Sequence, residues 1–215
     1  MTFLDHDSTQ APETRKDFSL IARWVHDGAR VLDLGCGDGG LLEFLRRKRN
    51  VRGYGVEISI DGVKACIARG VNVLQRDLEG GLADFDDAHF DYVILSQTLQ
   101  AMHNLDALVK SMLRVGREAI VTFPNFGYWP HRWQIMCAGR MPISRSLPYE
   151  WHNTPNIHLC TVNDFDRFLV ERQCEVMARM VIAHGKPVRF LPNVFGQLAL
   201  YRFRYRVQGS GDRGQ

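Results

Sequence analysis

Long hydrophobic runs are missing from this sequence, and cysteine is scarce. No window of the 215-residue chain contains the ~18 consecutive apolar residues that a membrane-spanning helix requires. The stretch 1–15 is polar and of mixed charge, which is not the pattern of a secretory signal peptide. The five cysteines are widely spaced and never arranged as Cys-x-x-Cys, so the sequence supports neither a disulfide framework nor a thiolate metal site. We therefore expect a cytoplasmic protein without a membrane segment.

A surplus of one charge is also absent. Lys and Arg number 27 against 24 Asp and Glu, and the resulting net charge of +3 is too small to indicate a nucleic-acid or anionic-membrane partner. Hydrophobic residues make up 45% and charged residues 24%, which are the values of a globular protein. At roughly 150 residues per domain, we expect a single domain over 1–207 and a disordered tail over 208–215.

From residue 30 onward, short apolar segments alternate with amphipathic ones. The expected strands are 30–34, 51–58, 71–75, 90–96 and 118–123, and the expected helices are 16–26, 40–48, 60–69 and 104–115. Because parallel strands need a crossover connection, this alternation indicates parallel neighbours. We expect an α/β fold with a doubly wound, mostly parallel, Rossmann-like sheet.

The alternation stops at residue 124. Five prolines interrupt the stretch 124–160, which is rich in Trp, Tyr, His and Asn, so we expect a long irregular insert there. A helix over 161–171 and strands over 176–183 and 198–207 are expected to follow. Within 201–206 aromatic residues alternate with arginines, which predicts an antiparallel C-terminal edge strand with one buried face.

A glycine-rich segment, DLGCGDGG over 33–40, follows the first expected strand and opens a helix. Open α/β sheets bind their ligands at this place. The loop satisfies Gly-x-Gly-x-x-Gly with Gly35, Gly37 and Gly40, and Glu57 lies roughly 20 residues beyond Gly35, where a ribose-binding acid is expected. NAD is therefore one interpretation of the loop.

Two acids in this segment favour a different ligand. A dinucleotide places its diphosphate on the N-terminus of the helix, and Asp38 puts a carboxylate there. Asp33 adds a second carboxylate just before the loop. Both acids favour a nucleoside with an ammonium or sulfonium centre.

Four ordered motifs resemble those of class I S-adenosylmethionine-dependent methyltransferases: VLDLGCGDGGLL (31–42), GVEIS (55–59), QRDLEGG (75–81) and FDYVILSQTLQ (90–100). The resemblance implies a sheet of the class I methyltransferase type that binds S-adenosylmethionine or S-adenosylhomocysteine. It implies that Gly35 and Gly37 lie against the amino-acid end of the cofactor, that Glu57 takes the two ribose hydroxyls and that Asp77 faces the adenine amino group. The residues expected to bind the cofactor are Asp33, Gly35, Cys36, Gly37, Asp38, Glu57, Ile58, Asp77, Leu78 and Ser96.

No catalytic residue is evident in the sequence. Class I enzymes that methylate amino groups of nucleic-acid bases often carry Asn/Asp-Pro-Pro-aromatic after the fourth strand, where this chain has SQTLQ over 96–100. His103 is the nearest candidate base, and its position before a helix favours a structural role. His152, His158 and Cys160 match no strong zinc pattern, so no metal is expected.

The second half of the chain resembles a narrower family. The segments FPNFGYWPHRWQ (123–134) and RSLPYEWHNTPNIHLCT (145–161) are similar to the MetW family of methionine biosynthesis proteins. This resemblance implies a methyltransferase-like subunit that associates with the homoserine O-acyltransferase MetX and activates it. The insert supplies a candidate contact surface in its large rings, Tyr128, Trp129, Trp133, Tyr149 and Trp151. Packing of these rings over the sheet is the alternative.

Two further functions stay open at this point. The chain could be a small-molecule methyltransferase that uses S-adenosylmethionine, with the insert closing over the acceptor. A weaker alternative is an NAD-dependent oxidoreductase. The expected small-molecule partner is a nucleoside for both the MetX-associated subunit and the methyltransferase, and a dinucleotide for the oxidoreductase.

Overall fold

The computed structural model describes residues 16–144 and 146–206, so the tail predicted at 208–215 lies outside the described residues. One sheet of eight strands runs in the order β3-β2-β1-β4-β5-β8-β6-β7. The strands are β1 Arg30–Leu34, β2 Arg52–Glu57, β3 Asn72–Gln75, β4 Phe90–Ser96, β5 Gly116–Pro124, β6 Cys174–Ala183, β7 Lys186–Pro187 and β8 Leu198–Tyr205. The helices are α1 Lys16–Trp24, α2 Gly40–Arg49, α3 Ile60–Ala68, α4 Leu105–Val115, α5 Trp129–Ala138, α6 Val162–Glu171 and α7 Pro192–Phe195.

The first five strands are parallel to one another. Helix α2 connects β1 to β2, α3 connects β2 to β3 and α4 connects β4 to β5, as the alternation in the sequence predicts. Side-chain caps start three helices: the side chains of Ser59, Asn104 and Thr161 accept hydrogen bonds from backbone N–H groups of α3, α4 and α6. The α/β class and the mostly parallel sheet with an antiparallel edge are confirmed.

The position of the last strand differs from the expectation. β8 pairs with β5 on one side and β6 on the other, both antiparallel, so it is an interior strand of the antiparallel edge region. Tyr201 and Phe203 are fully buried, as their alternation with arginine predicts. An edge position for 201–206 was wrong, because a period of two identifies a buried face and does not say which strands lie alongside.

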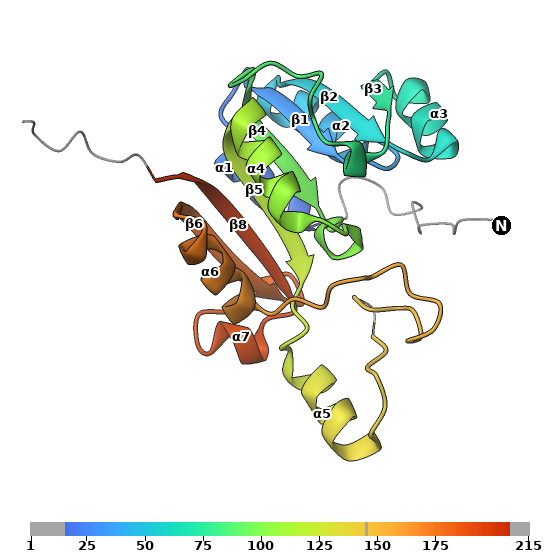
Figure 1. The fold of residues 1–215 in the computed structure, drawn as a ribbon, viewed down its shortest axis with the longest axis vertical. Helices are drawn as coiled ribbons and strands as arrows, with labels where there is room; N and C mark the ends of the chain where they lie inside the picture. Colours follow the sequence, from blue (N-terminus) through green and yellow to red (C-terminus); the bar gives the residue numbers. More distant parts are fainter. Residues whose placement is uncertain (1–15, 145, 207–215) are drawn as a thin grey trace, which may run out of the picture.

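Helices cover both faces of the sheet. One apolar cluster joins α4 and α6 to the sheet through residues such as Met112 and Phe165, and a second joins α1 and α2 to the opposite face through Ile21 and Leu45. Figure 1 shows α4 and α6 on one side of the sheet, with α1 and α2 behind it. No helix in the described part of the chain is long and apolar enough to cross a membrane.

The insert between β5 and α6 is more regular than expected. It contains a ten-residue helix, α5, which Figure 1 shows standing away from the sheet. The fully buried Asn125 fastens both ends of the insert: its Oδ1 accepts from the N–H of Gly127 (3.1 Å) and Val162 (3.2 Å). Its Nδ2 donates to the carbonyls of Asn193 (3.1 Å) and Gly196 (2.8 Å). The prolines predicted a long irregular insert, and the structure adds one helix, α5, to it.

Candidate functional site

The ten residues predicted to bind a cofactor lie at one edge of the sheet. They end or follow β1, β2, β3 and β4, which are neighbouring parallel strands. The carboxyl ends of such strands meet at the same edge, which is where α/β folds bind ligands. Among the described residues, no group of three or more acids, histidines and cysteines is placed to hold a metal ion.

The loop between β1 and α2 depends on glycine at two positions. Gly35 has a φ of +68°, and a Cβ atom there would lie 2.8 Å from the side chain of Thr98. Gly37 has a φ of +56° and turns its N–H toward β2. Left-handed backbone is costly for residues with a Cβ atom, so both positions favour glycine. Beyond Gly37 the space is open, because a Cβ atom there would meet nothing within 4 Å.

Glu57 is held by the same loop. Its Oε2 accepts from the N–H of Gly37 at 2.8 Å, and its Oε1 accepts from the N–H of Ser59 at 2.9 Å. Only 8% of the residue is exposed, and a Cβ atom on Gly62 would lie 2.8 Å from the Cγ of Glu57. Each oxygen of an ionised carboxylate has two lone pairs, so this fixed carboxylate can accept two further hydrogen bonds.

Asp38 does not carry an uncompensated charge. Its Oδ2 lies 2.7 Å from Nη2 of Arg69, and its Oδ1 accepts from the N–H of Gly40 at 3.0 Å. Arg69 also pairs with Glu43 at 2.9 Å. The argument that Asp38 repels a diphosphate was wrong, because an arginine from the end of α3 neutralises it. The cap position of α2 belongs to Gly39.

Two of the predicted residues direct their side chains inward. The Cys36 thiol lies 3.7 Å from the Cys66 thiol under the loop, and both belong to the apolar cluster beneath it. The hydrogen bond with Cys66, burial and the Asp33 carboxylate raise the pKa of the Cys36 thiol. Leu78 is buried in the cluster on the other face. The side chains of Cys36 and Leu78 therefore pack into the two apolar clusters.

The remaining predicted residues border the site. Asp33 is buried at the end of β1, whereas Ile58 is 62% exposed. Asp77 is exposed, and its Oδ1 accepts from the N–H of Glu79 at 2.9 Å. The Ser96 hydroxyl lies 3.2 Å from the Thr122 hydroxyl, so it is engaged inside the sheet.

Sequence reasoning missed the connection between α1 and the loop after β4. Gln97 has a φ of +55°, and its Nε2 donates to Asp17 Oδ2 at 3.0 Å. Asp17 is an acid on the buried side of an amphipathic helix, next to Phe18, and that placement is the signal available in the sequence. Strained residues of this kind gather near functional sites.

His103 is the candidate base named from the sequence, and it lies at the surface. Its Nδ1 is 3.3 Å from Glu79 Oε1, and its backbone N–H donates to the same oxygen. This contact supports the structural role.

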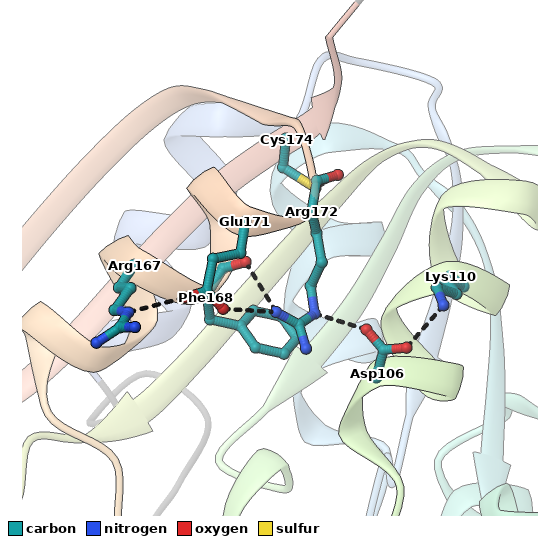
Figure 2. Close-up of polar contacts among 7 residues, drawn as sticks. All are labelled: Asp106, Lys110, Arg167, Phe168, Glu171, Arg172 and Cys174. Atoms are coloured by element: carbon teal, nitrogen blue, oxygen red, sulfur yellow. Dashed lines mark hydrogen bonds and ion pairs between the residues drawn. The ribbon is translucent and has the colours of Figure 1, made fainter.

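A separate hollow lies between α4 and α6. It measures about 460 Å³ and includes Asp106, Lys110, Glu171, Arg172 and Cys174 in its lining. Figure 2 shows that its charges are already paired: Asp106 lies between Lys110 (2.7 Å) and Arg172 (2.6 Å), and Arg172 stacks on Phe168. This network joins α6 to α4.

Comparison with known proteins decides the family. The model of the family "Methionine biosynthesis protein MetW" matches residues 15–203. The chain belongs to the MetW family. A protein of Rhodopirellula baltica, named bifunctional methionine biosynthesis protein MetXA/MetW, is 43% identical over 173 residues, covering 74% of this chain and 28% of its own length. Family membership establishes the link to methionine biosynthesis that the residues 123–161 indicate.

More distant relatives agree with the fold. A fatty-acid O-methyltransferase of Mycolicibacterium smegmatis is 30% identical over 104 residues, covering 46% of this chain and 37% of its own length. The chain thus spans well under half the length of either relative. The crystal structure of an S-adenosylmethionine-dependent methyltransferase from Mesorhizobium loti superposes with a TM-score of 0.68 at 17% identity, covering 90% of this chain and 99% of the other. The protein therefore has the class I methyltransferase fold.

Proposed function

We propose that this MetW family member is a methyltransferase-fold subunit that associates with the homoserine O-acyltransferase MetX and activates it, and that it binds S-adenosylmethionine or S-adenosylhomocysteine. One observation supports MetX as the partner: the Rhodopirellula relative is named for MetXA and MetW together, and this chain matches 28% of its length. Joining two proteins in one chain raises their effective concentration, which favours proteins that work in contact. The free state of all five cysteines supports a cytoplasmic location.

The glycine loop and Glu57 support the proposal that the chain binds a nucleoside. The two lone pairs of Glu57 that backbone N–H groups leave available suit the vicinal hydroxyls of a ribose, which a single carboxylate accepts side by side. The exposed Ile58 is an apolar surface beside this carboxylate, suited to a flat base. Asp77 accepts from an exocyclic amine, and Asp33 attracts the cationic sulfonium and ammonium groups. In this proposal Gly35, Gly37, Glu57 and Asp77 keep the roles that the methyltransferase resemblance implies.

Calorimetric titration of the purified chain with S-adenosylmethionine and S-adenosylhomocysteine tests the nucleoside. The Glu57→Ala variant removes both ribose hydrogen bonds to a charged acceptor, so we expect affinity to fall at least about tenfold. Glu175→Ala is the matched control, because this carboxylate pairs with Arg204 in the antiparallel region. Equal affinity of Glu57→Ala and the unaltered chain would place the nucleoside elsewhere.

A second candidate function is methyl transfer to a small molecule. The fatty-acid O-methyltransferase relative, 30% identical over 104 residues, favours this candidate. Incubation with S-adenosylmethionine carrying a labelled methyl group tests it. Enzyme-dependent appearance of the label in a product supports methyl transfer, and quantitative recovery of the label in S-adenosylmethionine counts against it.

A further inference from the structure

Helix α5 is built with its polar side inward. Seven of its ten residues are exposed, whereas His131 is fully buried and Gln134 is half-buried. The outward side carries large apolar side chains: Trp129 is 48% exposed, Trp133 56% and Met136 70%. A surface helix ordinarily places its apolar residues inward and its polar residues outward. The reversal indicates that the outward side is covered by another molecule.

The inward polar residues bond to other parts of the insert. His131 Nε2 lies 2.9 Å from the Ser144 hydroxyl. Gln134 bonds the backbone of Ile143 twice, accepting from its N–H at 3.1 Å and donating to its carbonyl at 3.3 Å. Burial lowers the pKa of His131, so the ring is neutral at pH 7. These contacts hold α5 against the returning chain and leave its apolar side chains without a place in the fold.

The exposed apolar residues form a continuous stripe. Trp129, Trp133 and Met136 are spaced by four and three residues, which places them on one face of the helix. This spacing is the pattern of helices that insert into an apolar groove of a partner. Tryptophan dominates the binding energy of such interfaces, and methionine adapts to their shape. Of the rings named from the sequence, packing over the sheet was wrong for Trp129, Trp133 and Trp151, which are all exposed.

The charge of the insert indicates which kind of partner surface is complementary to it. The insert 124–160 contains one acid, Glu150, and three arginines, Arg132, Arg140 and Arg145. Arg132, within α5, and Arg140, just after its end, are both exposed. A complementary surface therefore combines an apolar groove with an acidic rim.

We infer that the stripe formed by Trp129, Trp133 and Met136 is the surface by which the chain docks into an apolar groove with an acidic rim on its homoserine acyltransferase. This inference rests on the proposed function for the identity of the partner. Figure 1 shows α5 at the outer end of the insert, away from the sheet, so a partner can seat on the stripe without displacing a strand.

Biolayer interferometry with the purified cognate acyltransferase tests the stripe. We expect Trp133→Ala to weaken binding at least about tenfold, as truncation of a buried interface Trp does. Arg140→Glu is expected to weaken it as well and to reduce its dependence on salt. Phe190→Ala is the control, because this ring is 74% exposed and lies outside the insert. Unchanged melting temperatures verify that the variants are folded.

The outcomes separate the inference from the proposed function. If the unaltered chain does not bind the acyltransferase, the proposed function fails, and the partner assigned to the stripe fails with it. If the unaltered chain binds and Trp133→Ala binds equally well, the proposed function stands and the inference that the stripe is the docking surface is overturned. If Trp133→Ala instead converts a dimer of this chain into a monomer and leaves acyltransferase binding unchanged, the stripe joins two copies and the inference is overturned.

Discussion

Asn125 is expected to be the residue that most strongly ties the insert to the domain. Its amide makes four hydrogen bonds, two accepted from Gly127 and Val162 and two donated to Asn193 and Gly196, and it is fully buried. At ~1 kcal/mol net for each bond, Asn125→Ala is expected to lower the free energy of unfolding by about 4 kcal/mol. That is a large fraction of the free energy of unfolding of an ordinary domain, which is about 5 to 15 kcal/mol.

Urea unfolding followed by circular dichroism measures this change. Asn153→Ala is the control, because Asn153 accepts a single bond, from Glu150, and is exposed. We expect the control to lose under about 1 kcal/mol. A loss for Asn125→Ala as small as that of the control would refute the reasoning, since it would mean that the four bonds do not fasten the insert.

Two further changes test the sheet and the charge network. Gly55→Ala places a Cβ atom 2.4 Å from the Cys36 sulfur, so we expect a loss of about 1 to 3 kcal/mol in urea unfolding, whereas Gly80→Ala, with nothing within 4 Å, is expected to change little. A Gly55→Ala variant as stable as the Gly80→Ala control contradicts this packing. Hydrogen bonds from Lys110 and Arg172 lower the pKa of Asp106, so the stabilisation is present above its ordinary pKa of about 3.9 and is lost as pH falls through the lowered value. Asp106→Asn is therefore expected to be less stable than the unaltered chain at pH 7 and equally stable at low pH, and a constant difference across this range contradicts the network.

The parallel half of the sheet could be predicted from local patterns alone. β4 occupies the predicted range 90–96, because an almost continuous apolar run bounded by polar residues is typical of a strand that is buried on both faces of a parallel sheet. α4 occupies the predicted range 104–115 apart from Asn104, which caps it, because a side-chain acceptor at that position satisfies a free N–H of the first turn. Signals of this kind act within a few residues.

The features that the sequence did not reveal depend on distant residues. Asp38 lies in the loop before α2 and Arg69 lies at the end of α3. No periodic pattern in the sequence indicates that the two residues pair. β8 lies between β5 and β6 because its chain returns after α7, and its pattern of buried and exposed residues is the same for an interior or an edge place. α5 was not predicted because its polar residues turn inward, so its sequence lacks the pattern of an ordinary surface helix.

The rate of homoserine acylation tests the central claim most directly. The purified cognate acyltransferase is assayed at fixed acyl-CoA, alone and with increasing amounts of this chain, with no S-adenosylmethionine added. The account predicts a rate that rises with the chain and saturates, together with co-elution of the two proteins from a sizing column. An unchanged rate, with the two proteins eluting separately, would contradict the proposed function and leave methyl transfer to a small molecule as the function to pursue.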